Sequence, residues 1–235
     1  MRRALPIYAL AGVVLLSAGV IAHPTTRTFG TENFDFSQYV WFLSWWPNAL
    51  FAGHDSLHTT FLFAPGGYNM AWAATVPFLS VLSAPLTLLE GPIADYNALA
   101  LAAPVVSASA AFVLCRYVTR ARWPSVVGGA IFGFSPYVIG NEQVSALNLM
   151  YVALVPLAIW LVLRRWDREL RRAAFVAWFT ALIVAEFFIS TEVLATATAF
   201  GAATIVGLFA VSPAIRPRLR ALAVELLAAY GILAV

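Results

Sequence analysis

The chain has 235 residues, of which 62% are apolar and 11% are charged, and its mean hydropathy is +0.83. In soluble domains about a quarter of all residues are charged, so this composition excludes an ordinary soluble domain. The formal net charge of +3 comes from arginines without lysine, and no basic patch is interleaved with aromatic residues, so no nucleic-acid partner is expected. The single Cys115 lies in an apolar run, which excludes disulfides and cysteine metal sites.

The first apolar run, 4–22, follows Arg2 and Arg3 and could pass for a signal peptide. Its length of about eighteen residues exceeds the usual 7–15 residues of a signal-peptide core. We therefore predict a retained first helix.

The next segment, 23–70, is long and does not span. Within it, 35–53 is predicted to be a helix, because Trp41, Phe42, Trp45 and Trp46 fall on one side of a helix. The segment is too short to span, and tryptophan favours the headgroup level, so we predict a helix lying in the membrane interface. The alternative is a loop helix packed on the bundle.

A weak metal motif follows at AGHDSLHTT (52–60). His54 and His58 would share one face if this segment were helical, with Asp55 between them, and such side chains can bind zinc or another divalent ion. Gly53 and the lack of helical flanks argue against a rigid pair, and the spacing fixes no third ligand. A divalent-cation cofactor is therefore left open.

The remaining apolar runs predict an all-α, polytopic transmembrane helix bundle. Segment 71–89 is ambiguous because Pro77 and Pro85 interrupt it. The other runs are each about long enough to cross a hydrocarbon core of roughly 30 Å. The chain stops inside the last run, so it is expected to be the N-terminal part of a longer protein. The runs are 94–115, 123–140, 146–163, 173–190, 193–212 and 221–235.

The arginines predict the topology. If the N-terminus is cytoplasmic and 71–89 does not cross, thirteen of the fourteen arginines lie inside and only Arg27 lies outside. If the N-terminus is outside and 71–89 crosses, twelve lie inside. Because the first helix usually dominates orientation, we favour a multi-pass plasma-membrane protein with a cytoplasmic N-terminus. Residues 23–93 then form an outer loop with interfacial helices. The clusters are Arg2 and Arg3; Arg116, Arg120 and Arg122; Arg164, Arg165, Arg168, Arg171 and Arg172; and Arg216, Arg218 and Arg220.

In this topology most acids gather on the outer face, where converging carboxylates suit general-base or metal chemistry. The alternative is that outer loops carry acids because they are hydrated. Glu186 is expected to be the only acid well within a span and to pair with Ser190 or Thr191, and an intramembrane carboxylate is a functional candidate. The outer acids are Glu32, Asp35, Asp55, Glu90, Glu142 and Glu192, and Asp95 begins the next span there.

The order and spacing of four stretches of the chain resemble those of a known family. The chain, over roughly residues 30 to 220, resembles the N-terminal half of bacterial GT-C membrane glycosyltransferases, in particular uncharacterised actinobacterial-type members. Adjacent paired acids are missing at the first position, and Ala146 stands where close relatives would have a histidine. The stretches are DFSQYVWFLSWWPNAL, FAPGGYNMAWAATVPFLSVLSAPLTLLEGP, AAFVLCRYVTRARWPSVVGGAIFGFSPYVIGNE and ALNLMYVALVPLAIWLVLRR.

The resemblance implies transfer of a sugar from a polyprenyl-phosphate donor to an acceptor hydroxyl on the outer face, at a membrane lipid surface. Asp35 would be the catalytic base, and Glu142 would orient the acceptor or hold a divalent cation. Two alternatives stay open. A transporter or lipid flippase would use Glu186 and Glu192, and a non-catalytic membrane subunit would keep only the scaffold. Expected substrate-binding residues are Gln38, Glu32 and Glu192.

Overall fold

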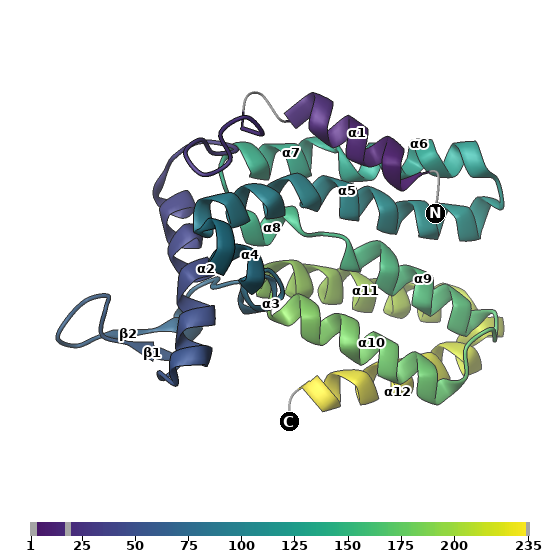
Figure 1. The fold of residues 1–235 in the computed structure, drawn as a ribbon. Helices are drawn as coiled ribbons and strands as arrows, with labels where there is room; N and C mark the ends of the chain where they lie inside the picture. Colours follow the sequence, from purple (N-terminus) through teal and green to yellow (C-terminus); the bar gives the residue numbers. More distant parts are fainter. Residues whose placement is uncertain (1–3, 17–19, 234–235) are drawn as a thin grey trace.

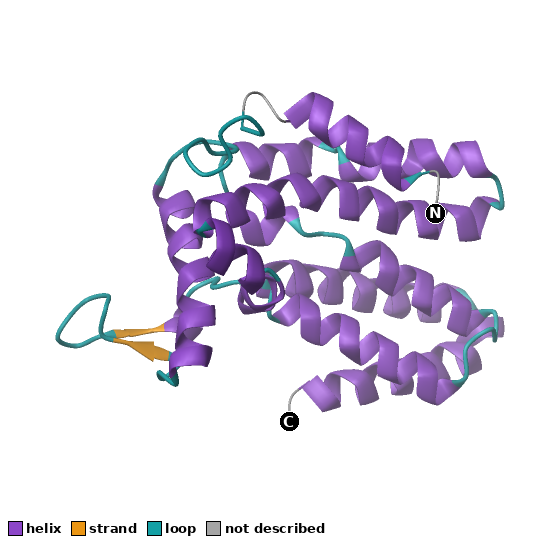
Figure 2. Ribbon diagram, in the orientation of Figure 1, coloured by secondary structure: helices purple, strands orange, loops and turns teal. Residues whose placement is uncertain are grey.

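The computed structural model describes residues 4–16 and 20–233, and in them the prediction of an all-α fold is confirmed (Figure 1). The only sheet among these residues is a short antiparallel pair, β1 (His58–Thr59) and β2 (Tyr68–Asn69), drawn in orange in Figure 2. The helices of the first half are α1 (Leu5–Leu16), α2 (Phe34–Ala52), η1 (Met70–Trp72), α3 (Pro77–Leu82), α4 (Ala84–Glu90) and α5 (Pro92–Thr119). Those of the second half are α6 (Arg122–Gly133), α7 (Pro136–Gln143), α8 (Leu147–Met150), α9 (Leu154–Trp166), α10 (Arg172–Phe187), α11 (Thr191–Val211), η2 (Pro213–Ile215) and α12 (Arg216–Leu233).

Helix α5 is the centre of the first half and contacts α1, α2, α4, α6, α7, α8 and α9. Helix α6 packs most closely on it, because Gly133 has no side chain to separate the backbones. A Cβ at Gly133 would collide with the backbone of Pro104 and Ala108. Helix α1 is held to α6 by the Tyr8 hydroxyl, which donates to the Val126 carbonyl at 2.9 Å.

Within residues 4–16 and 20–233, three helical stretches are long and apolar enough to cross a membrane: Pro92–Thr119, Leu147–Trp166 (which covers α8 and α9) and Thr191–Val211. The apolar run 123–140 differs from expectation, because Ser135 and Pro136 divide it into α6 and α7. The first run gives the 12-residue α1, and the described part of the chain continues from Val20 with turns.

Segment 71–89 is broken rather than continuous. Pro77 begins α3, and Ser83 separates it from α4, so the two helices have 6 and 7 residues. At 1.5 Å per residue, each is about 10 Å long, too short to cross. This agrees with the favoured arrangement, in which the segment stays on one side.

The connections of the bundle fall at two ends. One end, here called the arginine end, holds the α5–α6, α9–α10 and α11–α12 connections, and with them three of the four arginine clusters (right side of Figure 1). The fourth cluster, Arg2 and Arg3, lies outside the described residues. The opposite end, here called the acidic end, holds the loop before α2, the α7–α8 turn and the α10–α11 turn. The separation of charge expected from the sequence is therefore present in the fold.

Helix α2 forms as predicted, but its aromatic side faces protein. Phe42, Trp45 and Trp46 are buried in the largest core cluster, together with side chains of α3 and α5. The Trp46 indole donates to the Thr75 carbonyl at 3.1 Å. Protein therefore covers these three rings and α2 is packed on the bundle, while its position in the membrane interface stays a prediction.

Candidate functional site

The site is built around a segment of the loop before α2, residues 28–33, here called the strap. The strap runs across the turn that follows α7. The Thr31 amide donates to the Gln143 carbonyl at 3.0 Å, and the Ser145 hydroxyl donates to the Thr31 carbonyl at 2.8 Å. These two hydrogen bonds fix the strap to the turn, although the strap and the turn are more than 100 residues apart in the sequence.

Asn33 ends the strap and begins α2. Its side-chain oxygen accepts from the Phe36 amide at 2.9 Å, which caps the helix, and its side-chain amide donates to the Val144 carbonyl at 2.9 Å. Asp35 lies in the first turn of α2 and is half-buried. A carboxylate is favourable there because the helix N-terminus carries partial positive charge. The same cap thus places the first turn of α2, which carries Asp35, next to the α7–α8 turn.

Glu142 lies in the last turn of α7, where the strap covers it. Its side chain is 5% exposed, and its Oε2 atom has no hydrogen-bond partner among the described residues. Burial raises the pKa of Glu142 from 4.5 to about 7. The close cover depends on Gly30, whose φ of 76° and missing side chain let the strap pass over the Glu142 carbonyl. A buried, unpaired carboxyl group with a raised pKa is typical of functional sites.

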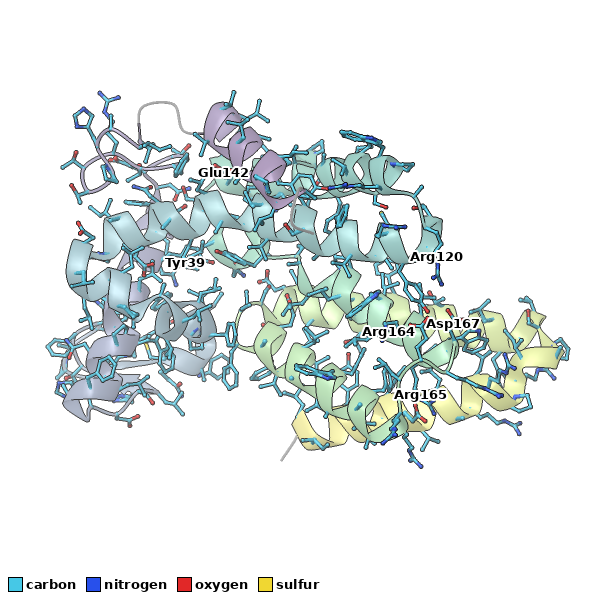
Figure 3. All side chains as sticks on the ribbon, turned by 45° about the vertical axis from the view of Figure 1, so that its right-hand side comes forward. Tyr39, Arg120, Glu142, Arg164, Arg165 and Asp167 are labelled. Atoms are coloured by element: carbon cyan, nitrogen blue, oxygen red, sulfur yellow. The ribbon has the colours of Figure 1, made fainter. Side chains whose placement is uncertain are left out.

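Tyr39, on α2, lies near Asp35 and Glu192. Its hydroxyl donates to the side chain of Asn148, and the residue is buried. Burial raises the pKa of Tyr39, and the charges of Asp35 and Glu192 add to the effect. Figure 3 shows Tyr39 and Glu142 on the side of the molecule away from Arg120 and Arg164.

The other predicted substrate-binding residues lie at the same end with more solvent around them. Glu32, in the strap, is exposed and accepts from the Thr28 hydroxyl at 3.3 Å. Gln38 is half-buried on α2, and Glu192 is exposed in the first turn of α11. The structure thus places Asp35, Glu142, Gln38, Glu32 and Glu192 at the acidic end.

Glu186 is buried near the end of α10, with 4% of its side chain exposed. Neither carboxylate oxygen has a hydrogen-bond partner in the described chain. The expected pairing with Ser190 or Thr191 is wrong, because the Ser190 hydroxyl accepts from the Val193 amide and caps α11 instead.

Two buried acids have partners that the sequence did not indicate. Glu225 on α12 lies in the apolar run 221–235 and is 4% exposed, so Glu186 is not the only acid buried within such a run. Glu225 accepts two hydrogen bonds from Arg165. Asp95 is fully buried and accepts from the hydroxyls of Ser83 and Thr87, which joins α4 to α5. Ser83 and Thr87 are four residues apart, and this spacing of two hydroxyls is the signal in the sequence that could have indicated their contact with Asp95.

The weak metal motif is not assembled. Helix α2 ends at Ala52, and His58 lies in β1, so His54 and His58 do not share a helical face. The Asp55 carboxylate accepts from the amides of Leu57 and His58, and His54 stacks on Trp45. Within residues 4–16 and 20–233, no group of three potential ligands that could hold a metal ion is found.

No family model, no curated protein and no solved structure matches this chain. In the described residues, the fold and site together define a mainly helical protein with three potential membrane-spanning helices and a group of carboxylates at the end opposite three of its arginine clusters.

Proposed function

We propose that the protein is a membrane glycosyltransferase, which transfers a sugar from a polyprenyl-phosphate donor to an acceptor hydroxyl at the acidic end. The observation that carries this proposal is the strap, which ties the start of α2, with Asp35, to the turn that follows Glu142. Two carboxyl groups in different settings, one half-buried and one buried, suit proton transfer combined with positioning of the acceptor.

In this reaction Asp35 accepts the proton of the acceptor hydroxyl while its oxygen attacks the anomeric carbon. The bond between that carbon and the lipid phosphate breaks, the phosphate keeps the bonding electrons, and the anomeric configuration inverts. A phosphate is a good leaving group, so no strong general acid is needed. Glu142 holds the acceptor by a hydrogen bond, which its protonated form donates and its ionised form accepts. Gln38, Glu32 and Glu192 border the sugar.

The placement in the membrane is part of the same proposal. The arginine end faces the cytoplasm, as the positive-inside rule requires, and the acidic end faces outwards. The protein is a multi-pass protein of the plasma membrane, where the donor lipid diffuses to the site within the bilayer.

Glu186 favours a second candidate, a transporter or lipid flippase. A buried carboxylate without a partner is where a coupling proton or cation would bind. In a glycosyltransferase, by contrast, Glu186 would affect stability before it affected chemistry.

The test compares wild-type protein with Glu142→Gln and Glu186→Gln in proteoliposomes that contain a polyprenyl-phosphate sugar. Sugar transfer should fall strongly in Glu142→Gln, whereas Glu186→Gln should lower yield or thermal stability while transfer per folded molecule is kept. Absence of transfer in the wild type, combined with substrate uptake that depends on Glu186, would overturn the glycosyltransferase in favour of the transporter.

A further inference from the structure

A hollow of about 330 Å³ opens on the surface between the C-terminal turns of α5 and the middle of α9. Both helices belong to the stretches that are long and apolar enough to cross a membrane. Their last turns lie at the arginine end, so a bilayer around these helices would bring lipid headgroups to the level of the hollow. The hollow is lined by Val113, Arg116, Tyr117, Arg120 and Trp160.

The acids of this end are already engaged. The Asp167 carboxylate accepts from the Tyr117 hydroxyl at 2.7 Å, and Glu169 pairs with Arg164 at 3.1 Å. Glu225, the third acid of the arginine end, is held by Arg165 on the far side of α9.

Arg116 and Arg120 form no ion pair with any residue in 4–16 or 20–233. Both side chains are exposed. They lie four residues apart on α5 and its C-cap, which places them on one face. The hollow therefore presents two cations without a counterion.

Aromatic rings support the arginines around the hollow. The Arg120 guanidinium lies 5.3 Å from the centre of the Tyr117 ring, and the Arg164 guanidinium lies 5.0 Å from that of Trp160. Stacking restricts Arg120, so less conformational entropy is lost when it binds an anion. Figure 3 shows Arg120, Arg164 and Asp167 together at this end.

The geometry points to a binding site for the headgroup of an anionic phospholipid in the hollow between α5 and α9. Arg116 and Arg120 hold the phosphate oxygens, Tyr117 and Trp160 lie at the glycerol level, and Val113, one turn deeper on α5, meets the start of an acyl chain. A lipid fits better than a free phosphate because tyrosine and tryptophan favour the headgroup level and because Val113 lines the hollow one turn deeper on α5. This site does not depend on the sugar-transfer proposal.

The experiment measures lipid retained by the purified full chain in a neutral detergent, by native mass spectrometry, during titration with phosphatidylglycerol. Phosphatidylcholine with the same acyl chains and inorganic phosphate are titrated in parallel. The double variant Arg116→Gln/Arg120→Gln should bind phosphatidylglycerol about thirtyfold more weakly, since each arginine near a headgroup contributes about 1 kcal/mol. Arg122→Gln/Arg171→Gln removes the same charge from exposed positions outside the hollow and should bind as the wild type does.

A third variant tests the shape of the hollow separately from the charge of its arginines. Val113→Trp narrows the hollow and keeps both arginines, and it should also weaken retention. Unchanged retention in either, or an equal loss in the Arg122 and Arg171 control, would overturn the site. Equal binding of phosphatidylcholine, or displacement of the lipid by millimolar inorganic phosphate, would overturn an anionic lipid as the ligand.

Discussion

Arg165 and Glu225, sixty residues apart, face each other in a two-pronged ion pair, with Nε to Oε2 at 2.7 Å and Nη2 to Oε1 at 2.6 Å. The pair joins α9 to α12, and Arg172 approaches the same carboxylate at 3.9 Å. Only 5% of the Glu225 side chain is exposed, so few waters compete for it.

Glu225→Ala should therefore destabilise the protein by about 3 kcal/mol, because it leaves Arg165 partly buried without its partner. Thermal unfolding in detergent measures the loss. The matched control is Glu169→Ala, which removes the exposed partner of Arg164 and should cost less than about 1 kcal/mol. Equal losses in the two variants would contradict a special role for the buried pair.

Asp35→Asn should lower the rate of sugar transfer on the order of 10²-fold or more, because the amide keeps the size of the side chain but cannot accept the proton. The readout is transfer from a polyprenyl-phosphate donor at equal amounts of folded protein. Glu32→Gln, three residues earlier in the exposed strap, is the control and should change the rate much less. An active Asp35→Asn protein would remove Asp35 from the role of base.

Stability should depend on pH through Glu142. The folded protein holds the Glu142 proton up to a pH of about 7, whereas the unfolded chain releases it near 4.5. Between these values the folded state binds more protons, so stability falls as pH rises, by up to about 3 kcal/mol in total.

Glu142→Gln removes this titration. Relative to the wild type it should gain stability above pH 7 and gain little near pH 4.5, as followed by thermal unfolding at pH 5 and pH 8. The difference between the two proteins isolates Glu142, because every other titrating group is shared. Parallel pH profiles would show that Glu142 is solvated in the folded state.

Gly30→Ala should disturb the site without touching a chemical group. The positive φ costs a residue with a Cβ about 1 kcal/mol or more, and that Cβ would collide with the Glu142 carbonyl. Both transfer and thermal stability should fall. Gly140→Ala is the control, because nothing lies within 4 Å of its Cβ position in α7, and it should be neutral or slightly stabilising.

The topology prediction is checked with a cysteine at Ser56, in the β-hairpin segment, on a Cys115→Ala background. It should react with a membrane-impermeant maleimide in intact cells, whereas a cysteine at the exposed Ala214, at the arginine end, should react only after lysis. The reverse pattern would favour the arrangement with the N-terminus outside.

The sequence predicts the helical class and the separation of charge well, because hydrophobic runs and arginine clusters are local patterns. It predicts less well those features that depend on contacts between residues far apart in the sequence. Ser135 and Pro136 cut one apolar run into α6 and α7, and protein rather than lipid covers the rings of α2. The strap was not foreseen, since its hydrogen bonds join residues more than 100 positions apart. The sequence does not indicate the contact between Glu225 and Arg165, because sixty positions separate the two residues.

The separation of charge has a consequence for how the protein behaves once inserted. Eleven arginines and three acids lie at one end of the described bundle, and eight acids and one arginine lie at the other. A guanidinium stays charged and costs about 3 kcal/mol at the bilayer centre, so turning the molecule over would require all eleven to pass through hydrocarbon. Orientation is then decided at insertion and not revised. Reconstitution without an insertion machinery should leave two populations that do not exchange, only one of which presents the acidic end to substrate added outside.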